Sequence, residues 1–303
     1  MNRRDFSKLS LAASLAPLAS GPAAWAAAPP STDNGGHQFS LMLWTLPKTL
    51  NFQQQLQVAA DAGMNSVEVG SEYENWTEAE WTSNLAKLKE LGLEVDSAVP
   101  GRNALADHSK RGALHDDIMR ALPGCKRLGC NQFIYTAYTR VPDQTPEAQR
   151  AAIVDTLKYT ADLLAKDNIE VVLEPIDLLE YPKEAVPSVA EAFEITRAVG
   201  SPLIKVLYDF YHEQRGSGNL IEKLDKNIDQ VGLVHIADVP GRHKPGTGEM
   251  NYDNIYRKLA ELNYSRVIGF EWMYLSDPVA ELKAERLHAI EVMDGAPAAK
   301  RMS

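Results

Sequence analysis

Four polar residues in the second half of the chain each end a short apolar run, and their types suit the binding of a metal ion. Glu174 follows Val-Val-Leu, and Asp209 follows Val-Leu-Tyr. His235 follows Leu-Val, and Glu271 follows Ile-Gly-Phe. Burying such groups separately would cost several kcal/mol each unless they were paired or bound to a cation. Together they form an oxygen-rich donor set for a divalent ion, Mn²⁺ or Mg²⁺ in the first place and Co²⁺ or Zn²⁺ as alternatives.

The segments around these residues alternate between short apolar runs and longer amphipathic ones. The runs predicted as strands are Phe39–Leu43, Ser66–Val69, Leu93–Ala98, Gln132–Thr136, Glu170–Glu174, Leu203–Asp209, Val231–Ala237 and Val267–Trp272. The segments predicted as helices include Phe52–Ala62, Glu78–Leu91, Glu147–Asp167, Val189–Val199 and Asp253–Leu262. Glycines at 63, 92, 129 and 200 are predicted to end helices.

This alternation predicts an α/β fold, a single (β/α)8 TIM barrel over residues 38–295 with a C-terminal tail at 296–303. The competing architecture, a doubly wound open sheet, needs a glycine-rich phosphate turn after its first strand. The segment Leu43–Pro47 contains no glycine. In a TIM barrel the active site lies at the carboxyl ends of the strands, so Glu174, Asp209, His235 and Glu271 are expected to meet there.

The first 26 residues are predicted to be a signal peptide, followed by a flexible linker at 27–37. Arg3 and Arg4 precede an alanine-rich apolar stretch that is too short to span a bilayer, and Ala-Trp-Ala at 24–26 suits signal cleavage. The pattern resembles the twin-arginine (Tat) export signal, which implies passage through the Tat translocase to the periplasm. The alternative is a disordered basic terminus of a cytoplasmic protein.

The charge and the cysteines restrict the classes of partner. The chain carries a net charge of −10, which disfavours binding to nucleic acid. No run after the signal peptide is long enough for a membrane span. Cys125 and Cys130 are either a periplasmic disulfide or two buried free thiols. A small keto acid or sugar is the expected partner, and a homo-oligomer is compatible with the sequence.

The segments after the fifth, sixth and seventh predicted strands resemble hydroxypyruvate isomerases. These belong to the xylose-isomerase-like TIM-barrel superfamily, which also contains ketose 3-epimerases. The resemblance covers about residues 38–290 and rests on LEPI at 173–176, YDFYHEQ at 208–214 and HIADVPGRHKPGTGEMNY at 235–252. It implies that Glu174, Asp209, His235 and Glu271 are metal ligands and that His212 and Arg242 contact the substrate.

The chemistry of such enzymes fits the residues present. Isomerisation and epimerisation both remove a proton from the carbon beside a carbonyl, and a divalent ion stabilises the resulting enediolate. Two carboxylates on opposite faces of the substrate can take and return that proton. Glu174 and Glu271 are the predicted catalytic pair.

Four residues are predicted to contact the substrate: His212, Arg242, Glu180 and Trp44. Arg242 could hold a carboxylate bidentately, within a glycine-rich loop that could close as a lid. His212 is predicted on a loop after the sixth strand. The competing interpretations are a solvated loop histidine, a surface ion pair for Arg242, a solvated Glu180, and barrel-mouth packing for Trp44. Glu68, which ends the second strand, is predicted to support the site from behind.

The substrate stays open at this stage. Hydroxypyruvate isomerases often have glutamine at the position of His235, and histidine there is more like the ketose epimerases. The expected activity is therefore isomerisation of hydroxypyruvate to tartronate semialdehyde, or of a related keto-sugar. An exported keto-sugar 3-epimerase is one alternative, and a periplasmic sugar- or metal-binding protein without turnover is another. A metal-dependent hydrolase or abasic-site nuclease on the same fold is disfavoured because no additional histidine ligands or basic groove are evident.

Overall fold

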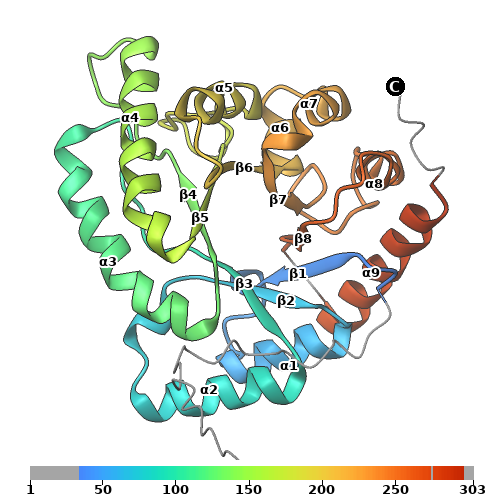
Figure 1. Ribbon diagram of the computed structural model, residues 1–303. Coiled ribbons are helices and arrows are strands. Elements are labelled where there is room, and N and C mark those ends of the chain that lie inside the picture. The colour runs from blue at the N-terminus through green and yellow to red at the C-terminus, as the bar shows by residue number, and fades with distance from the viewer. Residues whose placement is uncertain (1–33, 274–275, 297–303) are drawn as a thin grey trace, which may run out of the picture.

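The computed structural model describes residues 34–273 and 276–296 as a closed barrel surrounded by helices (Figure 1). The parallel strands follow one another in sequence order, and β8 pairs back with β1. They are β1 (Gln38–Met42), β2 (Ser66–Val69), β3 (Glu94–Ala98), β4 (Gln132–Thr136), β5 (Glu170–Glu174), β6 (Ile204–Asp209), β7 (Val231–Ile236) and β8 (Val267–Phe270). The predicted single TIM barrel is confirmed, and an open doubly wound sheet is excluded.

The helices lie on the outside of the barrel, between successive strands (Figure 1). They are α1 (Phe52–Ala62), α2 (Glu78–Leu91), α3 (Arg111–Leu128), α4 (Pro146–Leu164), α5 (Val189–Val199), α6 (Phe210–Gly216), α7 (Leu220–Asn227), α8 (Tyr252–Glu261) and α9 (Pro278–Asp294). Local chemistry sets their limits. Asn51 and Thr77 form capping boxes at the starts of α1 and α2. The four glycines predicted to end helices all do so in the left-handed conformation.

Two predicted boundaries near the site are wrong. The eighth strand ends at Phe270, so Glu271 lies one residue beyond it. The segment after the sixth strand is the helix α6 and not a loop, and it carries His212. The reason is that Asp209 caps this helix, with its Oδ1 accepting a hydrogen bond from the backbone N–H of Tyr211 at 2.8 Å.

The interior of the barrel has its own small apolar cluster, distinct from the larger core between strands and helices. Its buried members are Met42, Ile134, Val172, Leu207 and Leu233. Val172, Leu207 and Leu233 each lie two residues before a predicted metal ligand. Because side chains in a strand alternate with period two, each pair points to the same face. This cluster is therefore the floor beneath the site.

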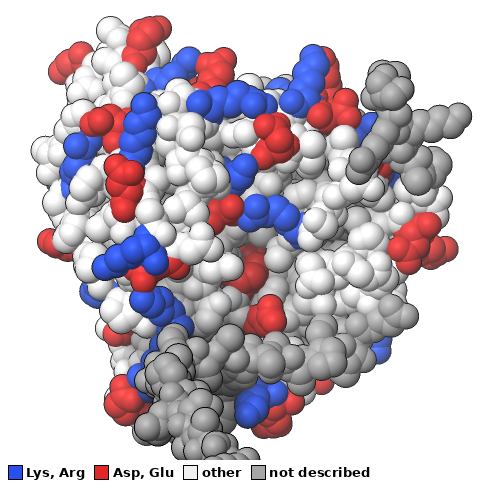
Figure 2. Space-filling model, in the orientation of Figure 1, with Lys and Arg blue, Asp and Glu red and all other residues white. Residues whose placement is uncertain are grey.

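Several other features bear on the sequence predictions. Residues 1–26 lie outside the described part of the chain. Asn34, assigned to the linker, is buried and hydrogen-bonded to Asn65. Cys125 and Cys130 are both buried free thiols. Within residues 34–273 and 276–296, no helix combines the length and apolar character needed to cross a membrane. On the face shown in Figure 2, acidic and basic side chains are interspersed.

Candidate metal centre and active site

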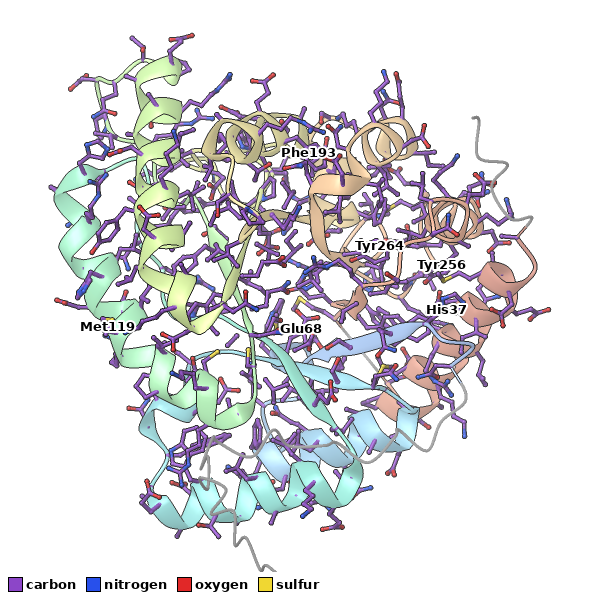
Figure 3. The ribbon with its side chains drawn as sticks, viewed as in Figure 1. His37, Glu68, Met119, Phe193, Tyr256 and Tyr264 are labelled. Carbon is purple, nitrogen blue, oxygen red and sulfur yellow. The ribbon has the colours of Figure 1, made fainter. Side chains whose placement is uncertain are left out.

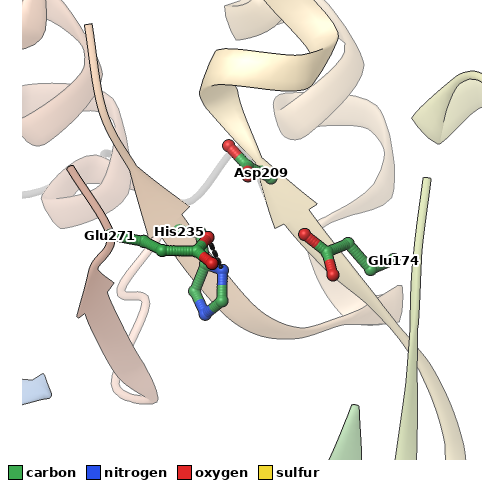
Figure 4. A group of neighbouring side chains, drawn as sticks. All are labelled: Glu174, Asp209, His235 and Glu271. Carbon is green, nitrogen blue, oxygen red and sulfur yellow. Dashed lines mark ion pairs between the residues drawn. The ribbon is translucent and has the colours of Figure 1, made fainter. Parts of the chain in front are cut away.

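The four strand-end residues form one buried cluster. Glu174, Asp209, His235 and Glu271 each offer a ligand atom, and these atoms all lie within 4.8 Å of one another. Glu174 and Glu271 lie on opposite sides of the cluster, with His235 and Asp209 between them (Figure 4). The carboxyl ends of four consecutive strands thus bring together residues separated by up to a third of the chain.

His235 is held between two carboxylates. Its Nε2 lies 2.7 Å from Oε2 of Glu68, which reaches across from β2, and its Nδ1 lies 2.6 Å from Oε2 of Glu271. Burial lowers the pKa of His235, but the charges of Glu68 and Glu271 outweigh it and raise that pKa well above its usual value. The predicted supporting role of Glu68 matches the usual arrangement in which a carboxylate orients a metal-binding histidine.

The donor set fits a divalent cation. The Nδ1 atom of His235 is buried and close to Glu271, yet it makes no aligned hydrogen bond. It faces the cluster while Nε2 is occupied by Glu68, so Nδ1 is available as a ligand. Three carboxylates and one imidazole in a buried position are stabilised by a cation in their midst.

Gly269 makes room for this arrangement. A Cβ atom at position 269 would lie 2.1 Å from Oε1 of Glu68 and 2.7 Å from Cδ2 of His235. Figure 3 places Glu68 in the interior of the barrel, where its Oε2 lies 2.7 Å from Nε2 of His235. Because Gly269 has no side chain, the side chains of Glu68 from β2 and His235 from β7 can both occupy the centre of the barrel.

The two glutamates predicted as the catalytic pair have different electrostatic surroundings. Burial, together with the charge of Glu271, raises the pKa of Glu174 to about 7. Burial acts on Glu271 in the same direction, but Arg242 and His235 outweigh it and hold its pKa well below the usual value. Pairs of carboxyl groups with separated pKa values are suited to divide the roles of acid and base.

Arg242 lies inside the site and is not a surface residue. Its Nη2 lies 2.6 Å from Oε2 of Glu271 and 3.1 Å from Oδ2 of Asp209. Its guanidinium carbon lies 5.4 Å from the ring centre of Trp44 and 5.1 Å from that of Tyr211. The planar group is thus fixed between two aromatic rings with its donors facing the cluster.

His212 is also buried, and its orientation comes from a residue that sequence reasoning did not single out. Its Nδ1 lies 2.8 Å from Oδ2 of Asp177, in the loop after β5. Its Nε2 faces the site, 3.4 Å from Nη1 of Arg242. Burial raises the pKa of Asp177, but the hydrogen bonds from His212 and from the backbone of Glu180, together with the charges of His212 and Arg215, outweigh it and lower that pKa. In the sequence, Asp177 is recognisable only as an aspartate three residues after Glu174. Its role becomes apparent only when the position of α6, which carries His212, is known.

The loop between β7 and α8 is pinned by a single carboxylate. Asp238 accepts hydrogen bonds from the backbone N–H groups of Val239, Gly246, Gly248 and Met250. Such a network of hydrogen bonds indicates that the loop is a fixed wall that positions Arg242, and not the mobile lid that was predicted. The loop also contains backbone in the left-handed region, at Arg242 itself.

The two remaining predicted substrate contacts, Trp44 and Glu180, lie in different surroundings. Trp44 follows β1 and its Nε1 donates a hydrogen bond to Oε1 of Glu271 at 3.0 Å. Glu180 is exposed and pairs with Arg215, whose Nη1 lies 2.6 Å from its Oε2. Trp44 therefore borders the cluster, whereas Glu180 is not among the residues that the fold gathers there.

A closed barrel of parallel strands, with buried side chains able to hold a metal ion at their carboxyl ends, is the architecture of TIM-barrel enzymes. Residues 56–293 match the model of the xylose isomerase-like TIM barrel family, and the chain belongs to that family. The chain is 31% identical over 246 residues to a 2-oxo-tetronate isomerase of Pectobacterium atrosepticum, covering 78% of this chain and 91% of that one. It is 30% identical over 177 residues to a hydroxypyruvate isomerase of Escherichia coli, covering 58% and 65%. The chain is an isomerase of this family.

Solved structures agree on the fold. A crystal structure described as an AP endonuclease, family 2, from Brucella melitensis superposes with a TM-score of 0.74 at 25% identity, covering 81% of this chain and 96% of that one. The E. coli 3-keto-D-glucoside 4-epimerase superposes with a TM-score of 0.69 at 21% identity, covering 84% and 99%. At such identities the second likeness concerns the barrel alone.

Proposed function

We propose that this protein interconverts a small hydroxy-ketone and the isomeric aldehyde with the help of a divalent metal ion. The substrate class is hydroxypyruvate or a related keto acid or keto-sugar. The observation that carries the proposal is the set of four ligand atoms within 4.8 Å of one another at the active end of the barrel. The names of the two relatives, a 2-oxo-tetronate isomerase and a hydroxypyruvate isomerase, support the reaction type.

The ion is held by Glu174, Asp209, His235 and Glu271. The oxygen-rich set favours Mn²⁺ or Mg²⁺, with Co²⁺ or Zn²⁺ as alternatives. When bound, the ion polarises the substrate carbonyl and lowers the free energy of the enediolate. Glu68 keeps the imidazole of His235 turned so that Nδ1 faces the cluster.

Glu271 and Glu174 move the proton. Glu271 is held as a carboxylate by Arg242 and His235, and it removes the proton from the carbon beside the carbonyl. Glu174 faces it from the other side of the cluster (Figure 4) and returns the proton. The proton returns to the former carbonyl carbon, and the proton of the substrate hydroxyl passes to the former carbonyl oxygen, which completes the isomerisation.

Three side chains bind and orient the substrate. Arg242 pairs with a substrate carboxylate or hydroxyl, and His212 donates to a substrate oxygen from Nε2 while Asp177 holds its Nδ1. Trp44 borders the Glu271 side of the cluster, where its indole N–H holds that carboxylate in place beside the substrate.

Hydrogen exchange tests the reaction type. The purified protein is incubated with Mn²⁺ and either hydroxypyruvate or 2-oxo-tetronate in deuterated water, and deuterium at the carbon beside the carbonyl is followed by NMR. We expect exchange together with the isomeric aldehyde as product from hydroxypyruvate, or the isomeric 3-keto acid from 2-oxo-tetronate. Exchange with an epimer as product would favour the keto-sugar epimerase instead, which the histidine at position 235 also suits. No exchange with any keto compound would contradict turnover and favour a binding protein.

We also propose export through the twin-arginine pathway. The support is the pair Arg3 and Arg4 ahead of a short apolar stretch and the Ala-Trp-Ala at 24–26. Replacing both arginines by lysine should shift the protein from the periplasmic to the cytoplasmic fraction. The control is the variant Arg102→Lys, far from the signal. An unchanged distribution would contradict this route.

A further inference from the structure

A cavity adjoins the cluster at the same end of the barrel. It has a volume of about 330 Å³, within the range of sites for small molecules. It lies among the segments that follow β1 and β2 and the first turn of α1. Its lining includes Trp44, Lys48, Phe52, Gln55, Glu72 and Trp76. None of these except Trp44 is needed for the isomerisation.

Barrel closure connects this cavity with the metal centre. Because β8 pairs with β1, the end of β8 that carries Glu271 lies beside the segment that carries Trp44. The indole of Trp44 donates to Glu271 at 3.0 Å and also lines the cavity. Trp44 therefore borders both the cluster and the cavity at the active end of the barrel, and a substrate that fills both would lie against this side chain.

The lining is amphipathic. Trp44 is 37% exposed, and Trp76 packs edge-on against Phe52 with ring centres 4.7 Å apart, so a rigid aromatic wall faces the cavity. Gln55, Lys48 and Glu72 add donors and acceptors. One cation and one acidic group give no excess of positive charge, so the cavity does not select a phosphate or a carboxylate.

From these features we infer that the cavity binds a neutral sugar ring that forms part of the substrate. A sugar ring has apolar C–H faces that pack on aromatic rings and hydroxyl groups that pair with amide, ammonium and carboxyl groups. The inference rests on the proposed function for the reacting end of the molecule. It narrows the substrate class to a keto-sugar joined to a further sugar unit, larger than a three- or four-carbon keto acid.

Binding of a sugar that cannot react tests the cavity independently of turnover. Methyl β-D-glucopyranoside is titrated into the full-length protein, with and without Mn²⁺, by calorimetry. We expect saturable binding that weakens about tenfold in Lys48→Met and in Glu72→Gln, since each loses one polar partner of the ring. The matched control is Lys158→Met on the outer face of α4, which should bind like wild type. Absence of saturable binding to the wild type, or equal binding by all variants, overturns the inference.

Turnover of two substrates provides the second test. For a keto-disaccharide, kcat/KM should fall about tenfold in Lys48→Met and Glu72→Gln, whereas for hydroxypyruvate it should change by less than about twofold. Equal losses for both substrates overturn the inference. If the wild type converts neither, the proposed function fails, and the glucoside titration still decides the cavity. Stronger binding of inorganic phosphate than of the glucoside would assign the cavity to an anion and also overturn it.

Discussion

At the scale of single residues, the proposed removal of the proton depends on the carboxylate of Glu271. It meets the imidazole of His235, the guanidinium of Arg242 and the indole of Trp44. The variant Glu271→Gln keeps the size and the hydrogen-bond acceptor for Trp44 but removes the base. We expect kcat to fall roughly 10²–10⁴-fold, with an unchanged circular dichroism spectrum. Glu291→Gln, on the exposed side of α9, is the control, and retention of wild-type turnover by Glu271→Gln would refute the role.

A second residue-scale prediction concerns Glu174 and pH. Its pKa is raised from 4.5 to about 7 in the folded protein, so the folded state binds that proton more tightly than the unfolded state. This tighter binding of the proton stabilises the folded state fully below about pH 4.5, and the stabilisation is lost as the pH rises through about 7. Without metal, the free energy of unfolding should therefore decrease toward alkaline pH by at most roughly 3 kcal/mol relative to Glu174→Gln. Urea denaturation of both proteins in chelator at several pH values measures this, and a pH-independent difference between them would count against it.

At the scale of elements, the approach of β2, β7 and β8 at the barrel axis decides how well His235 is oriented. Gly269→Ala adds a Cβ that meets Oε1 of Glu68 at 2.1 Å, so the Glu68 side chain must move away from His235. Loss of such an orienting contact typically lowers metal affinity 10–100-fold, and we expect about this decrease for Mn²⁺. Calorimetric titration measures the affinity. Gly112→Ala on α3, where an added Cβ meets nothing within 4 Å, is the matched control; equal affinities of the two variants would contradict the argument.

At the scale of the whole molecule, a metal bound at the cluster would join four strands that span the second half of the barrel. A ligand that binds only the folded state at 100 times its dissociation constant stabilises that state by about 2.7 kcal/mol. At that excess, and for a domain of this size, we expect Mn²⁺ to raise Tm by about 5 °C over the chelator-treated protein. Differential scanning calorimetry measures the shift, and Asp209→Asn should reduce it. Identical melting curves with and without Mn²⁺ would argue against a metal at the cluster.

Much of this organisation is local and could be predicted from the sequence. A strand in a barrel is a short apolar run, a helix that covers it is amphipathic, and a glycine marks the turn between them. Because strand side chains alternate, the last inward position of each strand follows directly from the run before it. Glu174, Asp209 and His235 were placed in this way, and Glu271 to within one residue of its strand.

The tertiary structure alone decided which side chains touch across the barrel. His235 and Glu68 are 167 residues apart, and Asp177 meets His212 only because α6 begins at Phe210 and turns that histidine inward. The burial of Arg242 and the cavity beside Trp44 likewise depend on closure between β8 and β1. A sequence pattern predicts to which face of its own strand each side chain points. Contacts between strands require the register and curvature of the closed sheet, which no single segment contains.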